Sequence, residues 1–151
     1  MRMNGLDIIY RRRGEYSKAE ALFTLCLERR KEVLGPNERG TLQTMSGLAT
    51  NYCKQHDYVQ SETLFHQAIA KMTEILGEDD RLTLTSIFLL ASMYREKLDF
   101  QQAKQCYTAC LEKQQKVFGD THPDTVKTKD GLSRTLDEMK GREEFDESLA
   151  D

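Results

Sequence analysis

The sequence predicts an all-α protein built from repeated pairs of antiparallel helices. The first observation behind this prediction is a fixed period of 42 residues: the strings VLGPNERGT, ILGEDDRLT and VFGDTHPDT begin at residues 33, 75 and 117. Self-similarity at a constant period is typical of a repeat array. The second observation is the spacing of apolar residues by three and four positions, as in Leu64, Ala68 and Met72, which is the periodicity of a helix.

Each repeat combines a shorter helix, a tight turn and a longer helix. In the second repeat the shorter apolar stripe ends before the polar turn at 54–57, and the longer stripe runs on to Gly77. Glycine accepts the left-handed conformation that is common just past a helix end. In the following connector, Asp120, Thr121 and Asp124 offer caps for the next helix, and Pro123 is tolerated in its first turn. We therefore expect helices at residues 2–13, 17–34, 41–55, 59–76, 83–97, 101–118, 124–139 and 142–150.

Composition and charge exclude several classes of protein. Hydrophobic residues make up 38% and charged residues 31% of the 151 residues, a balance that permits a packed core and argues against disorder. The net charge of -3 gives no reason to expect nucleic-acid binding, and no apolar run has the length of a signal peptide or a membrane span. We expect a cytoplasmic protein that binds neither nucleic acid nor membrane.

The repeated residues resemble the tetratricopeptide repeat, in particular the longer form of kinesin light chains, and the sharpest match is FGDTHPDT at 118–125. The connectors at 35–41 and 77–83 lack the His-Pro of that motif, and no heptad segment for a kinesin heavy chain is present. The resemblance implies a right-handed α–α superhelix of tetratricopeptide helix hairpins, in a single array with units at about 1–36, 37–78, 79–120 and 121–151, the last with a C-terminal capping helix. In the second unit its packing positions fall on Leu48, Ala49, Tyr52, Tyr58, Ser61, Phe65 and Ala68.

The resemblance also implies a non-catalytic scaffold or adaptor that binds a partner peptide in the concave groove lined by the shorter helices. Partners of this kind include cargo segments, some of them acidic with a tryptophan, and a kinesin-related complex. The predicted groove positions are Asn4, Arg11, Arg12, Gln43, Ser46, Thr50, Lys54, Phe88, Ser92, Arg95, Lys127 and Arg134; Thr85, Leu89, Glu96, Asp130, Asp137 and Glu138 share this face. Cations outnumber anions there, which favours an acidic partner.

Two of these assignments have structural alternatives. The charged residues are also explained as solvated helix faces. Phe88 and Leu89 either offer an apolar anchor to the partner or pack against a neighbouring helix. The run Arg11-Arg12-Arg13 is interpreted as a complement to the negative end of a helix dipole rather than as a nucleic-acid signal.

The sequence contains no motif for catalysis or for metal binding. Cys106 and Cys110 lie four residues apart on one helix face, but two ligands do not make a zinc site, and Cys110 and Cys26 fall on core positions of the repeat. The cysteines lack paired CxxC spacing, so reduced thiols are expected. The histidines are scattered, and no nucleophile, base and orienting group occur together. We expect no enzyme activity and no cofactor.

The two ends of the sequence raise a second hypothesis. Projecting the period backwards places the start of the first helix before Met1, so an apolar edge at Leu6 and Ile9 is expected to be uncapped. Phe145 and Leu149 are expected to pack inward from the capping helix, with an acidic tail that competes for the basic groove of another copy. The alternative function is therefore a structural segment of a larger repeat protein, which self-associates through the N-terminal helix or assembles through its ends or convex face.

Overall fold

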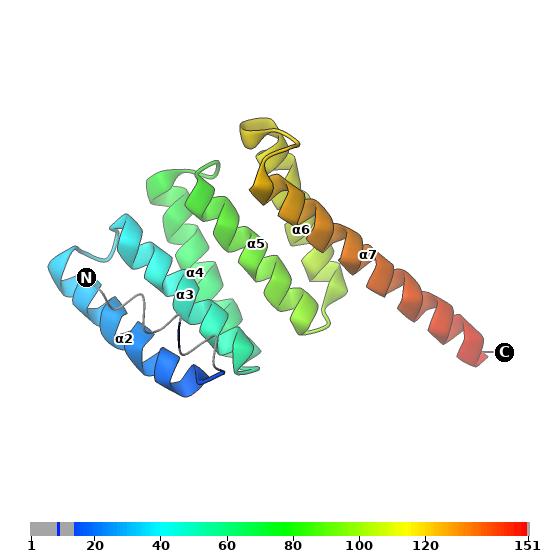
Figure 1. The fold of residues 1–151 in the computed structure, drawn as a ribbon, viewed down its shortest axis with the longest axis horizontal. Helices are drawn as coiled ribbons and strands as arrows, with labels where there is room; N and C mark the ends of the chain where they lie inside the picture. The colour runs from blue at the N-terminus through cyan, green and yellow to red at the C-terminus, as the bar shows by residue number, and fades with distance from the viewer. Residues whose placement is uncertain (1–8, 10–13, 151) are drawn as a thin grey trace. The chain divides into compact units, whose positions relative to one another are not determined.

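The computed structural model describes Ile9 and residues 14–150, and the described residues form six α-helices and no strand (Figure 1). These helices are α2 (Tyr16–Val33), α3 (Arg39–Lys54), α4 (Tyr58–Leu76), α5 (Arg81–Glu96), α6 (Phe100–Phe118) and α7 (Pro123–Ala150). The predicted all-α repeat fold is confirmed. The helix expected at 2–13 lies outside the described residues, Ile9 excepted.

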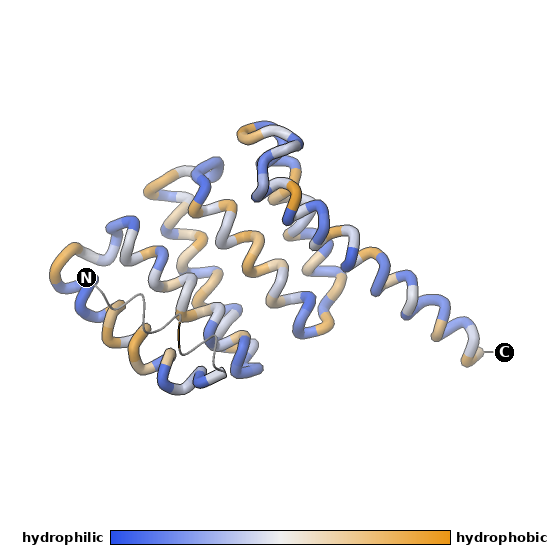
Figure 2. Tube along the Cα trace, in the orientation of Figure 1, coloured by the Kyte–Doolittle hydropathy of each residue, from blue (hydrophilic) through white to orange (hydrophobic). Residues whose placement is uncertain are grey.

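Two compact units divide the chain, Met1–Ser86 and Ile87–Asp151, with the boundary inside α5. In the first unit α3 packs against both α2 and α4, and in the second unit α6 packs against α7. Figure 2 shows hydrophobic residues recurring along these helices. The main core cluster of the first unit contains Ala19, Phe23, Leu27, Leu42, Met45, Leu48, Ala68 and Met72. Cys26 and Cys110 are buried, as predicted.

The connectors that follow the longer helices share a glycine at the repeat spacing, and the first two also share a threonine hydrogen bond. Gly35, Gly77 and Gly119 have φ angles of 100°, 94° and 87°, a region that side chains disfavour. The Thr41 hydroxyl donates a hydrogen bond to the carbonyl oxygen of Gly35, and the Thr83 hydroxyl donates one to the carbonyl oxygen of Gly77, each at 2.9 Å. The predicted helix ends at these glycines are confirmed. Each of the two threonine hydrogen bonds connects the start of the next helix to the glycine that follows the previous helix.

The caps of the shorter helices also occupy one repeat position. A carboxylate oxygen of Glu38 accepts from the Gly40 amide at 2.7 Å, and one of Asp80 accepts from the Leu82 amide at 2.8 Å. At the third connector the His122 Nδ1 accepts from the Asp124 amide at 3.1 Å. This differs from the expected caps, because Asp120 instead accepts from Gln115 and Lys129.

Aromatic rings of the longer helices lie directly on glycines of the shorter helices that follow. A Cβ atom added to Gly47 would lie 2.6 Å from a ring carbon of Phe23, and one added to Gly131 would lie 2.7 Å from a ring carbon of Tyr107. The two contacts stand at equivalent repeat positions, one in each unit. The close packing of α2 against α3 and of α6 against α7 therefore depends on the absence of a side chain at Gly47 and at Gly131.

The C-terminal helix differs from its prediction. One continuous helix, α7, runs from Pro123 to Ala150 instead of ending at 139. A Cβ atom added to Gly141 would meet nothing within 4 Å, and this glycine does not interrupt the helix. Arg142 lies over the Phe100 ring at 4.8 Å, where α6 begins. Beyond that point α6 offers no further surface, so Phe145 and Leu149 are 61% and 70% exposed and do not pack inward as expected.

We predict that Gly131→Ala destabilises the protein by about 1–3 kcal/mol, because a methyl group would overpack the buried Tyr107 ring. The control is Gly141→Ala, in which the same change is made at an open position of the same helix. It should raise stability by up to about 1 kcal/mol, since alanine favours a helix more than glycine does. Urea unfolding followed by circular dichroism checks both values. Equal effects of the two variants would contradict the ring-on-glycine contact.

Candidate functional site

The predicted surface of α3 is largely exposed, with one exception. Gln43 and Lys54 are exposed and Thr50 is half-buried. Ser46 is only 4% exposed, and its Oγ lies 2.8 Å from the Oγ of Ser86. Ser46 therefore links α3 to the beginning of α5 and does not present its side chain to a partner. The next residue along the chain is a glycine. Helical spacing alone does not show how closely α5 approaches α3 at this point, so the burial of Ser46 was not expected.

A polar hollow of about 270 Å³ lies between the beginnings of α3 and α5 in the first unit. Gln43 and Thr85, both expected on the partner-facing side, line it together with Arg39, Arg81 and Leu82. The two arginines were not among the predicted residues. The repeat carried a signal for them, because Arg39 and Arg81 stand at the same position of successive repeats.

Electrostatics at the hollow are dominated by a bidentate ion pair. The two Nη atoms of Arg39 each lie 3.0 Å from an oxygen of Asp80. The hydrogen bond from Arg39 holds the pKa of Asp80 below its ordinary value, with further help from the Leu82 amide, and it raises the pKa of Arg39. Arg81, the first residue of α5, adds an exposed guanidinium. Since α3 and α5 both begin here, their dipoles add positive potential, which favours a carboxylate ligand.

In the second unit, the predicted residues of α5 are held by α6. The Phe88 and Tyr107 rings are in edge contact with centroids 5.8 Å apart. The Ser92 Oγ lies 2.9 Å from the Tyr107 hydroxyl and donates to the Phe88 carbonyl oxygen at 3.1 Å. Phe88, Ser92 and Arg95 are all half-buried. Phe88 thus packs against the neighbouring helix α6, as the structural alternative predicted, and the residue is half-buried.

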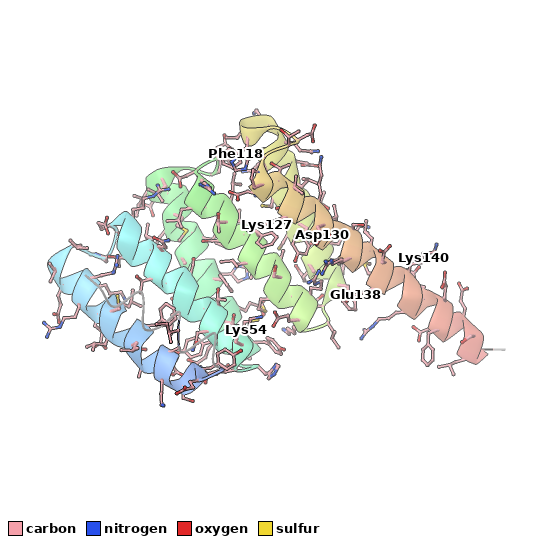
Figure 3. The ribbon with its side chains drawn as sticks, in the orientation of Figure 1. Lys54, Phe118, Lys127, Asp130, Glu138 and Lys140 are labelled. Carbon is pink, nitrogen blue, oxygen red and sulfur yellow. The ribbon has the colours of Figure 1, made fainter. Side chains whose placement is uncertain are left out.

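Of the two cations predicted on α7, Arg134 forms an ion pair with an acidic neighbour. Lys127 and Arg134 are exposed, as expected for a binding surface. The Arg134 Nε lies 3.0 Å from an Asp130 oxygen, and Figure 3 labels Lys127 and Asp130 near the beginning of α7. Asn4, Arg11 and Arg12 lie outside the described residues. The groove predicted to run along the whole array stays a prediction.

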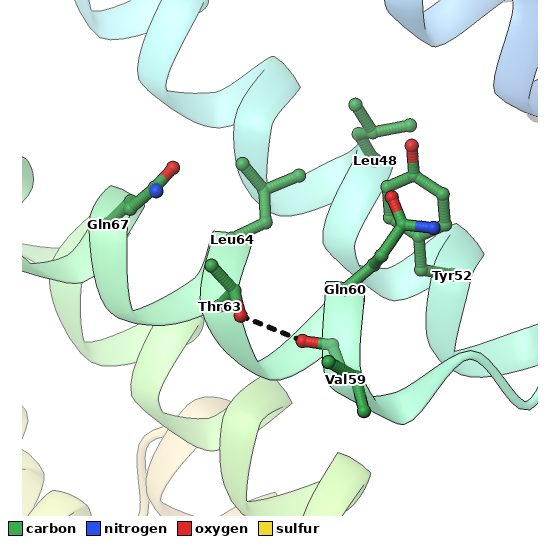
Figure 4. A pocket seen from close by; sticks show the side chains of 7 residues that line it. All are labelled: Leu48, Tyr52, Val59, Gln60, Thr63, Leu64 and Gln67. Atoms are coloured by element: carbon green, nitrogen blue, oxygen red, sulfur yellow. Dashed lines mark hydrogen bonds between the residues drawn. The ribbon is translucent and has the colours of Figure 1, made fainter.

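A second hollow, of about 300 Å³, lies between α3 and α4 on the other side of α3 (Figure 4). At 3.6 residues per turn, Leu48 and Tyr52 point away from Gln43 and Lys54. The lining is mainly apolar and consists of Leu48, Tyr52, Val59, Gln60, Thr63, Leu64 and Gln67. Burial and the nearby Glu20 carboxylate raise the pKa of the Tyr52 hydroxyl. The sequence did not indicate this hollow, because the spacing of its apolar residues is that of core positions.

The thiols and other metal-ligating groups fit a structural role. Burial raises the pKa of the Cys110 thiol to about 11, so it stays protonated at neutral pH and is a poor nucleophile. Among residues 14–150 no three His, Cys, Asp or Glu side chains gather in a way that could hold a metal ion. Within the same residues, no helix is long and apolar enough to cross a membrane.

Comparison with known proteins agrees with these observations. The family model for the tetratricopeptide repeat matches residues 4–58 and 41–113, which is more than half of the chain. The chain therefore belongs to the tetratricopeptide repeat family, and the predicted resemblance is confirmed. No curated protein matches the sequence.

Two solved structures of similar fold were found, and one of them is named for a kinesin light chain. Nearly identical TPR-like repeats named for a kinesin light chain of Podosopora anserina superpose with a TM-score of 0.79 at 20% identity, covering 88% of this chain and 63% of that chain. BtubC (BKLC) from P. vanneervenii gives a TM-score of 0.77 at 19% identity, covering 87% of this chain and 53% of its own. The chain thus spans between half and two thirds of the length of these structures, and the likeness shows the fold.

We predict that Asp80→Asn lowers stability at neutral pH but has little effect in acid. The pKa of Asp80 is depressed in the folded state, so its stabilisation is present above its unfolded pKa and is lost as pH falls through the folded value. Because the pair is partly exposed, the loss should stay below about 1 kcal/mol. Urea unfolding at neutral and acidic pH measures it. The neighbouring exposed Asp79→Asn is the control, and an equal pH dependence in both variants would contradict the assignment.

Proposed function

We propose that this protein is a non-catalytic scaffold that binds a segment of a partner protein on the exposed sides of its shorter helices. Tetratricopeptide repeats mediate protein–protein interaction in general, and the family membership supports that level of description. The observation that carries the more specific proposal is the polar hollow of the first unit. Residues expected to face the partner, Gln43 and Thr85, lie there beside the guanidinium groups of Arg39 and Arg81.

The chemistry of the hollow favours an acidic side chain of an extended peptide. A guanidinium presents paired N–H donors that match a carboxylate, and an amide and a hydroxyl beside it bind the remaining oxygens or the peptide backbone. The charge of Arg39 is partly offset by Asp80, and Arg81 supplies a second, exposed cation beside it. An exposed Lys54 at the other end of α3 (Figure 3) extends the same side of the helix.

The names of the similar structures support a cargo-type or adaptor role. The repeats named for the kinesin light chain of Podosopora anserina share this fold, and an acidic cargo segment has the charge that the hollow selects. In this proposal the partner is a protein of the cytoplasm, a kinesin-related complex among the candidates. The second unit contributes through the exposed Lys127 and Arg134 and the half-buried Arg95.

The alternative, a structural segment that assembles with other repeats, also has a specific observation behind it. The apolar hollow between α3 and α4 includes Val59, which is 76% exposed. An exposed apolar lining of that kind is more typical of assembly than of charge-directed peptide binding.

We expect an acidic peptide that contains one tryptophan to bind the native protein saturably. The variant Arg81→Glu should bind this peptide at least about tenfold more weakly, which corresponds to a loss of about 1.4 kcal/mol of binding free energy. This variant leaves the Arg39–Asp80 pair in place. Fluorescence anisotropy of the labelled peptide measures binding at low and moderate salt. The control is Arg29→Glu on α2, which changes the net charge equally at another exposed arginine.

Circular dichroism verifies that both variants are folded. Equal losses of affinity in the two variants would indicate that long-range charge alone attracts the peptide. No binding to the native protein would favour the structural alternative.

A further inference from the structure

The N-terminal cap of α7 differs chemically from the caps of α3 and α5, although all three stand at one repeat position. Residues 38, 80 and 122 are spaced by the repeat period and directly precede the three helices. Glu38 and Asp80 cap α3 and α5 with carboxylates. His122 caps α7 with an imidazole, because its Nδ1 accepts from the Asp124 amide at 3.1 Å. An imidazole nitrogen accepts a hydrogen bond only while it carries no proton of its own.

The imidazole is held in place by the end of α6. The ring of Phe118, the last residue of α6, is stacked on the His122 ring with centroids 4.7 Å apart and an interplanar angle of 28°. Leu34 and Leu76 stand at the position of Phe118 in the earlier repeats, so the aromatic ring and the imidazole occur together. An aromatic face accommodates a charged as well as a neutral ring. The stack therefore keeps Nδ1 beside the Asp124 amide in both protonation states.

The start of α7 depends on its cap more than the starts of α3 and α5 depend on theirs. In the first two connectors a threonine hydroxyl also donates to the carbonyl oxygen of the preceding glycine, as Thr41 does to Gly35. Thr125 stands at the same repeat position and is fully buried, and its hydroxyl has no hydrogen-bond partner among the described residues. Loss of the His122 bond therefore leaves the start of α7 without either of the two hydrogen bonds that hold its equivalents.

The charged groups around His122 come from the connector, from α7 and from α6. Asp120 precedes it in the connector, and Asp124 lies in the first turn of α7. An Asp120 oxygen accepts from the Lys129 Nζ at 2.8 Å, so a cation already lies beside this exposed carboxylate. The nearest cation of α6 along the chain, Lys116, is exposed. Because water screens exposed charges, the attraction of an imidazolium to these carboxylates is weaker than the loss of an N-terminal cap.

We propose that His122 makes the start of α7 a pH-sensitive element, which is capped while the imidazole is neutral and loses its cap when the imidazole is protonated. A protonated Nδ1 places a second donor against the Asp124 amide, and its charge lies at the positive end of the helix dipole. Imidazoles change their charge between about pH 8 and pH 5, where the carboxylates of Glu38 and Asp80 stay ionised. Acidification therefore uncaps α7 and leaves the caps of α3 and α5 in place.

NMR spectroscopy of the ¹⁵N-labelled full chain between pH 8 and pH 5 tests the proposal. The Asp124 amide resonance should shift with the same midpoint as the His122 ring protons. Its hydrogen-exchange protection factor should fall about fivefold, the effect of losing one cap. The Gly40 and Leu82 amides are the internal controls, since carboxylates cap them at the same repeat position, and they should keep their protection. An Asp124 amide that keeps its protection, or equal losses at all three amides, would overturn the proposal.

A variant that keeps the cap but cannot titrate provides a second test. Asparagine is a good N-terminal cap, so the melting temperature of His122→Asn should fall by at least about 2 °C less than that of the native chain between pH 8 and pH 5. The control is His66→Gln, which removes an exposed imidazole of α4 that lies 3.8 Å from Glu62. It should keep a fall at least as large as the native one, because a protonated His66 pairs with that carboxylate. Equal falls in the native chain and in His122→Asn, followed by circular dichroism, would contradict the assignment.

Discussion

In the pairs α2–α3 and α6–α7, the close approach of the two helices depends on an aromatic ring that packs against a glycine. At Gly47 and Gly131 the Phe23 and Tyr107 rings occupy the space where a side chain would begin. A small side chain serves the same purpose within a helix pair, where Ser61 is fully buried and donates to the Ala49 carbonyl oxygen at 2.7 Å. Because helices this close leave little room for relaxation, the packing tolerates small residues at these points and few others.

That closeness also positions the candidate site. In the first unit the Ser46–Ser86 hydrogen bond lies between α3 and the start of α5, while the Arg39–Asp80 pair joins their beginnings. Asp80 simultaneously caps α5 through the Leu82 amide. The side chains of Gln43 and Thr85 are thus held beside a fixed hollow rather than on independently moving helices, and a prepositioned site loses less entropy when a peptide binds.

Local chemistry explains what could be predicted from the sequence. The 42-residue period and the glycines after each longer helix place every described helix within about two residues of its observed bounds, α7 excepted, as expected for strongly periodic segments. The differences arise where tertiary contacts decide. Burial of Ser46 depends on the approach of α5, capping by His122 depends on the turn geometry, and the continuity of α7 reflects a glycine that nothing forces out of the helix. Arg39 and Arg81 were missed because they flank the predicted face.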